Sequence, residues 1–559
     1  MRDKPASGSL PAPATTVTAY GPPASIRGRD FLSTLRILGR HGVRRPVHSA
    51  KHALALGSKL GRILLGSARE QPGPDPRFND PAWTLNPFYR RSLQAYQAWQ
   101  KELNAWIDDS DLNSDDRERA RFIAALISDA LAPSNHPLNP LALKELLTSG
   151  GGSLLKGVGH LLDDLLHNGG MPSQVNKQAF EIGRNLAATP GAVVFRNEVL
   201  ELIQYHPQGE KNYSRPLFIV PPQINKFYVF DLSPEKSYVQ YALKNNLQVF
   251  IVSWRNPDAR HSEWDLSTYV QALEEALDVC LAITGSKDAN LIGVCSGGLT
   301  IAALQGYLQA KRQLRKIASA SYFVSLLDSR IDIPIALFAG EKTLDFAKQR
   351  SHQQGVLKGS DMARVFAWLR PNDLIWNYWI NNYLLGKEPP AFDILYWNND
   401  STRLPAAFHA DLLEFFKHNP LLRPGALKIG GLPIDMRKVT VDSFSVAGVN
   451  DHITPWESVY RSTLLLGGDR RFILSNSGHV QAILNPPSNP KANYFMNDEL
   501  GADPQAWYGQ TTQVKGSWWI LWNSWLQERS GELGDAPQDL GSLHYPPIEA
   551  APGSYVLER

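Results

Sequence analysis

The stretch Gly293-Val294-Cys295-Ser296-Gly297-Gly298 decides the fold of this chain. It follows the mostly apolar run 289–292 and precedes residues with apolar side chains at helical spacing. A turn from a strand into a helix around a nucleophile is strained and closely packed, so it needs small neighbours such as these glycines. We therefore interpret the stretch as a nucleophile elbow in which Cys295 replaces the usual serine. The helix would begin at Ser296, and its N-terminal dipole would favour a thiolate suited to acyl transfer through a thioester.

Two later segments supply an acid and a base in the chain order nucleophile, Asp, His that hydrolase-like sites require. Asp451 follows a predicted strand at 439–446, and His479 follows the next predicted strand, 472–474. Each residue has an ordinary alternative: a buried cysteine, a helix-capping carboxylate and a polar loop residue. Because all three lie at strand ends in the required order, we predict a Cys295–His479–Asp451 triad.

Short apolar strands alternate with helices from residue 215 onward. Strands are expected at 217–220, 249–253, 289–292 and 318–326, and helices at 235–244 and 266–283. This alternation predicts a parallel, doubly wound sheet, and together with the elbow it predicts an α/β-hydrolase fold. The glycines at 293–298 lack the Lys-Ser/Thr pair of a phosphate loop, and neither a cofactor nor a metal is expected.

Composition divides the chain into four parts. Residues 1–29 and 531–559, rich in Pro, Ser, Gly or Asp, are expected to be flexible tails. Residues 30–190 are expected to be mainly helical, and residues 191–530 to form the catalytic domain. Within that domain an aromatic-rich insertion at about 328–438 is either ordinary core or a cap over the site.

Positive charge is concentrated near the start of the chain. Residues 1–70 hold twelve Lys or Arg against three Asp or Glu, and segments 30–43 and 52–65 have apolar residues at helical spacing. Such helices either pack on the protein's own core or lie on an anionic interface.

The overall composition is that of an intracellular globular protein. The chain has 559 residues, of which 43% are hydrophobic, and only two cysteines. Few cysteines and the lack of a cleavable leader favour the cytoplasm over secretion. Cys280 shares one face of a predicted helix with apolar residues and is expected to be a core residue. No apolar run reaches the ~18 residues of a membrane span, and a net charge of +3 gives no reason to expect nucleic acid.

At the site residues the chain resembles the polyhydroxyalkanoate synthases. Their box Gly-x-Cys-x-Gly-Gly is present at 293–298, and their later blocks Gly-x-x-Asp-His-Ile and Gly-His are present at 448–453 and 478–479. The resemblance extends from about residue 80 to about 530, and the length and residues 290–300 look like the pseudomonad, class II type for medium-chain monomers. Further matching segments are Pro221-Pro222-Gln223-Ile224-Asn225-Lys226-Phe227-Tyr228, Ser253-Trp254-Arg255-Asn256-Pro257 and Tyr396-Trp397-Asn398-Asn399-Asp400.

The resemblance implies a polymerase that joins (R)-3-hydroxyacyl-CoA units into a polyester and releases CoA. Cys295 would attack the thioester, and the backbone N–H groups of Ser296 and Ile224 would hold the oxyanion. The incoming 3-hydroxyl would be activated by His479 with Asp451 orienting it, or by Asp451 more directly. Residues expected to shape the acyl pocket are Asn225, Ser325, His452, Ser477 and Gln481, with local loop hydrogen bonds as the alternative for Asn225 and His452.

The family also implies partners and a location. These synthases work in the cytoplasm at the surface of the polyester inclusion that they build, so the growing chain, the granule surface and granule-associated proteins are expected partners. The cap is expected to serve as a lid and as the contact of a homodimer. Two rival functions remain: a cysteine-based acyl-CoA thioesterase or esterase, and a noncatalytic inclusion-coat protein. A dry, aromatic cap favours the polymerase over the thioesterase, and a coat protein leaves the triad unexplained.

Overall fold

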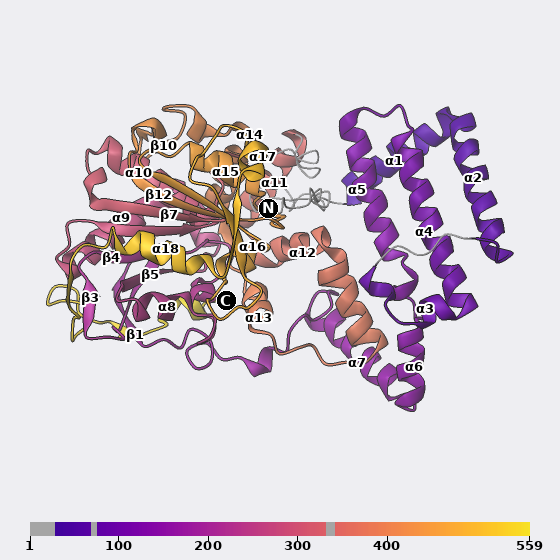
Figure 1. Ribbon diagram of the computed structural model, residues 1–559, viewed down its shortest axis with the longest axis horizontal. Coiled ribbons are helices and arrows are strands. Elements are labelled where there is room, and N and C mark those ends of the chain that lie inside the picture. The colour runs from indigo at the N-terminus through magenta and orange to yellow at the C-terminus, as the bar shows by residue number, and fades with distance from the viewer. Residues whose placement is uncertain (1–27, 69–74, 331–340) are drawn as a thin grey trace, which may run out of the picture.

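The computed structural model describes residues 28–68, 75–330 and 341–559. The tail predicted over 1–29 lies outside these ranges, except for its last two residues, which begin helix α1. An eleven-stranded sheet forms the centre of the catalytic part, in the order β15-β14-β13-β12-β7-β6-β4-β5-β2-β1-β17 (Figure 1). The family of folds predicted from the elbow, α/β-hydrolase, is therefore the one observed.

The six middle strands of the sheet are parallel. Their side chains are buried on both faces, which explains why they read as continuous apolar runs in the sequence. They are β4 (Pro216–Val220), β5 (Gln248–Trp254), β6 (Ala289–Val294), β7 (Ile317–Phe323), β12 (Asp442–Gly448) and β13 (Arg470–Ser475).

The two edges of the sheet differ from the parallel arrangement that the alternation after residue 215 predicts. Strands on both sides pair antiparallel with their neighbours. For β1 and β2 the short turn at 197–199 allows only that direction. One edge consists of β1 (Gly191–Arg196), β2 (Leu200–Tyr205) and β17 (Glu549–Ala550), and the other of β14 (Asn493–Met496) and β15 (Thr512–Lys515).

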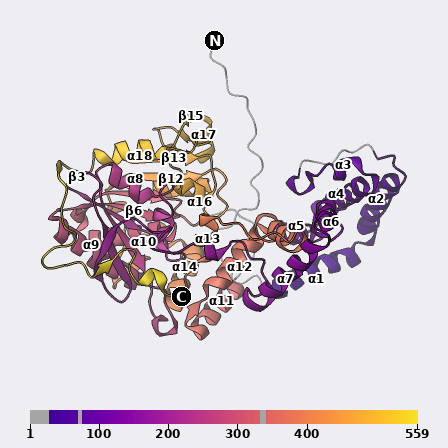
Figure 2. The same cartoon turned by 90° about the horizontal axis from the view of Figure 1, so that it is seen from below.

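Helices cover both faces of the sheet, as the view from below shows (Figure 2). Helices α9 (Leu266–Thr284) and α10 (Ser296–Ala310) pack together on one face, while α8 (Tyr238–Lys244) and α18 (Trp518–Gln527) cover the other. Tryptophans of α18 pack on the sheet, where Trp522 Nε1 donates to Ser321 Oγ at 3.0 Å. Cys280 of α9 is fully buried, as expected, and burial raises the pKa of its thiol. Shorter helices α15 (Trp456–Leu464), α16 (His479–Ile483) and α17 (Pro504–Gly509) complete this part.

A long excursion of the chain separates β7 from β12, although these strands are neighbours in the sheet. We call residues 324–441 the cap. Its elements are α11 (Glu341–Gln354), β8 (Val356–Leu357), α12 (Gly359–Leu369), two π-helical turns (Asn372–Trp376 and Trp379–Leu384), α13 (Asp393–Asn399), β9 (Leu404–Pro405), α14 (Ala406–His418), β10 (Lys428–Ile429) and β11 (Leu432–Pro433).

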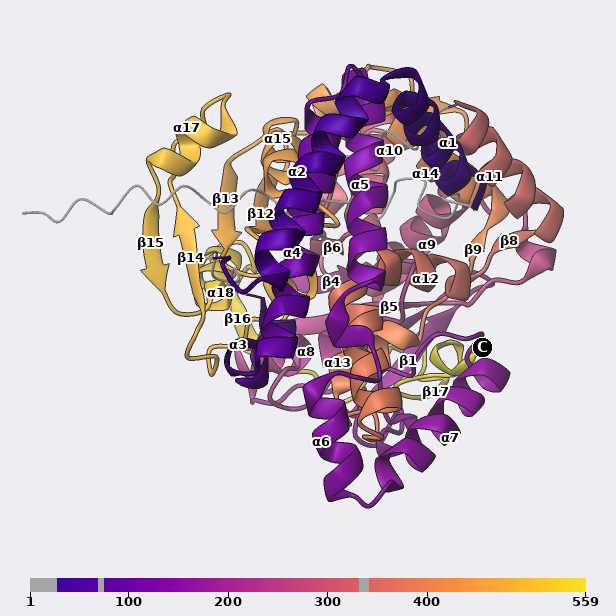
Figure 3. The ribbon, with the colours of Figure 1, turned by 90° about the vertical axis from the view of Figure 1, so that its right-hand side faces the viewer.

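The N-terminal region is helical and extends to one side of the sheet (Figures 1 and 2). Helices α2, α4 and α5 run side by side in Figure 3, and Lys59 Nζ of α2 lies 2.6 Å from Glu102 Oε2 of α4. The amphipathic pair predicted at 30–43 and 52–65 thus packs on its own region, while Leu54 stays 74% exposed. The helices are α1 (Gly28–Arg44), α2 (Pro46–Leu64), α3 (Ala82–Leu85), α4 (Pro87–Asp108), α5 (Ser114–Ala130), α6 (Pro140–Thr148) and α7 (Gly152–His167).

The N-terminal region docks on the cap through α7. Tyr383 Oη of the second π-helical turn donates to Asp164 Oδ2 at 2.8 Å, and Asn382 Nδ2 donates to Ser173 O at 2.7 Å. At Gly157 the two backbones are so close that a Cβ would lie 2.0 Å from Tyr383 O. No helix within the described ranges has both the length and the apolar character that crossing a lipid bilayer requires.

The last segment, 531–559, corrects the prediction of a flexible tail. It forms β16 (Leu533–Asp535) against β3 (Lys211–Tyr213), and β17 pairs with β1 at the edge of the main sheet. Tyr555 and Val556 are buried. Strand pairing with distant residues, together with side-chain contacts such as those of Glu201, holds this Gly- and Pro-containing segment in place.

Candidate active site

Cys295 lies in a strained turn between β6 and α10. Its backbone has φ 52° and ψ −119°, in the left-handed half of the φ range that non-glycine residues rarely adopt. The turn tolerates no side chain at Gly297, where a Cβ would lie 2.3 Å from Val220 O. Cys295 N donates to Phe323 O at 3.0 Å, and the residue is 5% exposed at the edge of a cavity. The local sequence therefore holds a thiol at the carboxyl end of the central strand.

Asp451 and His479 come from the loops after β12 and β13, which are adjacent strands. His479 Nδ1 lies 2.7 Å from Asp451 Oδ2. The sequence had indicated that His479 lies in a loop after the strand. In the structure it is the first residue of α16. The Asp451 side chain is fully buried, and its Oδ1 accepts the backbone N–H groups of Ile453 and Thr454 at 2.8 and 2.9 Å. A buried carboxylate with these donors stays ionised at low cost.

Thr454 is a site residue that the sequence analysis missed. Its hydroxyl donates to Asp451 Oδ2 at 2.6 Å and lies 3.2 Å from His479 Nδ1. The signal was present, because a Thr three residues after an Asp and just before a helix is a common local hydrogen-bonding pattern. Thr454 fixes the carboxylate that faces the imidazole.

The electrostatics of the pair favour an imidazolium beside a carboxylate. Burial lowers the pKa of His479, but the charge and hydrogen bond of Asp451 and the contact with Cys295 outweigh it and raise this pKa to about 10. Burial raises the pKa of Asp451, yet the charge of His479 and the hydrogen bonds around it bring this pKa below its ordinary value. Each group therefore stabilises the charged form of the other.

The loop after β4, residues 221–226, lies between the elbow and the cap. Gln223 N donates to Ser296 Oγ at 3.1 Å, and Thr402 N of the cap donates to Ile224 O at 2.9 Å. Thr402 Oγ1 also donates to Gln223 O. Among the described residues, neither Ser296 N–H nor Ile224 N–H has a protein acceptor. Of these two residues, Ser296 follows Cys295 directly, and Ile224 lines the same cavity as Cys295.

A cavity of about 1900 Å³ opens between the sheet, the cap and α7. Burial is the main cause that lowers the pKa of His452 to about 4, so this side chain lines the cavity in its neutral form. Ser325 corrects the prediction, because it lies behind the elbow, where its hydroxyl donates to Phe323 O at 3.0 Å and its Cβ is in the way of any Cβ at Gly298. The predicted residues that line the cavity are Ile224, Asn225, Cys295, Asp451, His452, Ser477, His479 and Gln481.

Known proteins resemble this chain over its whole length. The family model described as poly-beta-hydroxybutyrate polymerase (PhaC) N-terminus matches residues 74–242, and that of the alpha/beta hydrolase fold matches residues 216–486. Poly(3-hydroxyalkanoate) polymerases 2 and 1 of Ectopseudomonas oleovorans are 63% identical over 100% of both chains and 56% identical over 96% of both chains, respectively. The poly(3-hydroxyalkanoate) polymerase subunit PhaC of Cupriavidus necator is 38% identical over 90% of this chain and 86% of its own.

These relatives and the fold agree with the resemblance seen in the sequence. The elbow, the parallel sheet and the helical N-terminal region are found in one chain that aligns from end to end with named polymerases. The chain therefore belongs to the poly(3-hydroxyalkanoate) polymerases and is an acyltransferase.

Proposed function

We propose that the chain polymerises (R)-3-hydroxyacyl-CoA of medium chain length through a thioester on Cys295, with His479 and Asp451 completing a catalytic triad. The observation that carries the proposal is the 2.7 Å contact between His479 Nδ1 and Asp451 Oδ2 at the edge of the cavity that Cys295 also lines. With Nδ1 occupied, Nε2 is the imidazole nitrogen left for the thiol.

In the acylation step, the proton of the Cys295 thiol is held on His479 as the imidazolium, and Cys295 Sγ forms a bond to the acyl carbon. The N–H groups of Ser296 and Ile224 hold the resulting oxyanion. The C–S bond to CoA then breaks, and the CoA thiolate receives the proton from His479. One thioester replaces another, so the acyl group keeps its activation for the next step.

In the elongation step, the 3-hydroxyl of another acyl unit attacks the thioester on Cys295. His479 is supported as the base, because both Asp451 oxygens already accept hydrogen bonds and the carboxylate is fully buried. Asp451 orients the imidazole and stabilises its charged form. The ester forms, the C–S bond breaks, and the thiol regains the proton from His479.

The medium-chain assignment rests on the segment 290–300 and on the cavity. Helix α13 of the cap contributes Ile394, Leu395 and Trp397 to its lining, which gives an alkyl side chain apolar partners. Exclusion of water by such a wall favours polymerisation over hydrolysis, and this separates the proposal from the thioesterase alternative.

The first experiment measures CoA release from (R)-3-hydroxydecanoyl-CoA by wild type, Cys295→Ala and Cys280→Ala, with the acyl product analysed for chain length. We expect release and insoluble polyester from wild type and Cys280→Ala, and a loss of at least about 10³-fold in Cys295→Ala. Undiminished release by Cys295→Ala would refute the covalent mechanism. Release with only free 3-hydroxydecanoate would make the chain a thioesterase, and release from 3-hydroxybutyryl-CoA alone would overturn the medium-chain assignment.

We extend the proposal to the surface of the polyester inclusion as a partner. Six apolar side chains of α7 are between 46% and 77% exposed, far more apolar surface than one helix of a monomer ordinarily leaves to water. These side chains, which we call the α7 apolar face, are Leu154, Leu155, Val158, Leu162, Leu165 and Leu166. Dimerisation through the cap stays a prediction.

A further inference from the structure

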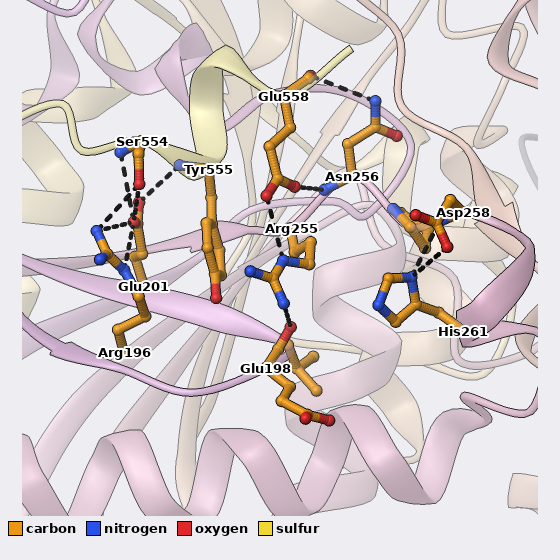
Figure 4. A network of polar contacts seen from close by, with 12 residues as sticks. Arg196, Glu198, Glu201, Arg255, Asn256, Asp258, His261, Ser554, Tyr555 and Glu558 are labelled. Carbon is orange, nitrogen blue, oxygen red and sulfur yellow. Dashed lines mark hydrogen bonds and ion pairs between the residues drawn. The ribbon is translucent and has the colours of Figure 1, made fainter.

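Ser554, Tyr555 and Glu558 take part in a network of polar contacts with residues of β2 and of the segment after β5 (Figure 4). Glu201 of β2 is fully buried, and its carboxylate accepts the backbone N–H of Tyr555 at 3.1 Å and the hydroxyl of Ser554 at 3.0 Å. Gly553 precedes them with φ +79°, and a Cβ there would lie 2.4 Å from Glu201 Oε2. This segment therefore binds at one place and in one conformation.

Tyr555 is clamped between two guanidinium groups. The Arg255 guanidinium lies 4.1 Å and that of Arg196 5.5 Å from the centre of its ring, and Tyr555 Oη donates to Asn197 O at 2.7 Å. Stacked cations of this kind hold an aromatic ring firmly when the site is partly buried. The clamp fixes the direction in which the chain continues toward Glu558.

Glu558 joins the loops that follow β4 and β5. Its carboxylate accepts Arg255 Nε at 3.2 Å and Asn256 N at 3.1 Å, both after β5. Its backbone carbonyl accepts Lys226 Nζ at 2.7 Å, and Lys226 belongs to the loop after β4. Lys226 is only 3% exposed, so its ammonium group depends on these acceptors.

Both loops also form hydrogen bonds with residues of the cap. Lys226 O accepts Trp397 Nε1 at 2.7 Å, and Trp397 lines the cavity. Asn256 Oδ1 accepts a hydrogen bond from Arg403 N at 2.9 Å. Arg403 follows Thr402, whose N–H donates to Ile224 O. Residue 558 thus reaches the loop of Ile224 in two ways. Its backbone carbonyl binds Lys226 of that loop directly, and its carboxylate holds Asn256, whose side chain binds the cap next to Thr402.

We propose that Glu558 and Tyr555 are positioning residues for acyl transfer, which hold the loop 221–226 so that Ile224 N–H faces the oxyanion formed at Cys295. This rests on the oxyanion role given to Ile224 above. Neither residue lines the cavity, so neither touches the substrate. A misplaced backbone donor lowers the rate of the chemical step and leaves substrate binding and the thiol itself unchanged.

The test compares Glu558→Gln with Asp535→Asn. The control lies in the same C-terminal segment and breaks an ion pair, with Lys211 at 2.6 Å, that is remote from the loop 221–226. For both variants and wild type we would measure kcat and KM for CoA release, the rate at which iodoacetamide alkylates Cys295, and the Tm. Alkylation needs a reactive thiol but no oxyanion donor, so it separates the two requirements.

For Glu558→Gln we expect kcat to fall roughly 10-fold, with KM, the alkylation rate and Tm within error of wild type. Asp535→Asn should match wild type in all four. An unchanged kcat, or a kcat that falls together with the alkylation rate and Tm, would overturn the proposal. A wild type whose release does not depend on Cys295 would instead refute the proposed function.

A second pair of variants shows whether the effect of Glu558→Gln comes from the lost contact or only from the lost negative charge. Lys226→Met removes the donor to Glu558 O, whereas Lys226→Arg keeps a cation on the same side chain. We expect Lys226→Met to lower kcat as Glu558→Gln does and Lys226→Arg to recover most of it, while equal activities of the two Lys226 variants would count against the proposal.

Discussion

Asp451 raises the pKa of His479, and this makes the stability of the protein depend on pH. The pKa of His479 is about 10 in the folded protein, whereas an unfolded histidine has a pKa of about 6.5. Between these values the folded state keeps a proton that the unfolded state has released. The contribution of His479 to stability is therefore complete below pH 6.5 and is lost as the pH rises toward 10.

Replacing Asp451 with Asn removes the largest influence that raises the pKa of His479, so the loss of stability between pH 6.5 and 10 becomes smaller in the variant. We expect the Tm difference between wild type and Asp451→Asn to be greater at about pH 6.5 than at any higher pH and to narrow steadily toward pH 10. Thermal unfolding at intervals of one pH unit measures it, with Asp535→Asn as a control whose curve stays parallel to wild type. A difference that is constant with pH would contradict the raised pKa.

Among the elements, α7 depends on one glycine for its docking on the cap. A Cβ at Gly157 would lie 2.0 Å from Tyr383 O, whereas a Cβ at Gly159 of the same helix meets nothing within 4 Å. We expect Gly157→Ala to destabilise the protein by about 1–3 kcal/mol through overpacking. Gly159→Ala should stabilise it by up to about 1 kcal/mol through helix propensity. Urea unfolding measures both, and equal changes in the two variants would show that this contact does not hold the helix.

At the scale of the whole molecule, the α7 apolar face is expected to direct the enzyme to the polyester. Leu155→Gln combined with Leu166→Gln should lower the fraction of enzyme that sediments with washed polyester particles, because apolar burial drives such binding. CoA release in solution should not change. Lys156→Gln, an exposed neighbour on the same helix, is the control. Unaltered sedimentation of the double variant would remove this face as the attachment surface.

The sequence predicted the middle of the molecule better than its edges, for physical reasons. Strands buried on both faces are apolar without interruption, so β4, β5 and β6 were found within one or two residues, whereas the strand predicted at 318–326 ends three residues earlier, at Phe323. In β2 the buried Glu201 and Gln204 break that pattern. The Glu201 carboxylate accepts hydrogen bonds from Ser554 and Tyr555, which lie more than 350 positions later in the chain. Nothing in the sequence near Glu201 predicts these contacts.

The site residues show the same limit at the level of side chains. The order and strand-end positions of Cys295, Asp451 and His479 could be read from the chain, because loops after parallel strands meet at one edge of the sheet. The direction of a side chain could not. Ser325 lies at such a strand end as well, yet it turns toward the elbow backbone and away from the cavity.

The cap leaves the sheet after β7 and returns at β12, two strands that are hydrogen-bonded to each other from Ser319 and Asp442 to Phe323 and Val446. Val324 N, the first cap residue, still donates to Val446 O at 2.8 Å. An enzyme whose product lengthens at every turnover must accommodate a chain of changing length beside catalytic residues whose spacing stays fixed. Because both ends of the cap are anchored on one pair of hydrogen-bonded strands, we expect any displacement of the cap by the product to leave the spacing between the Cys295 thiol and the His479 imidazole unchanged.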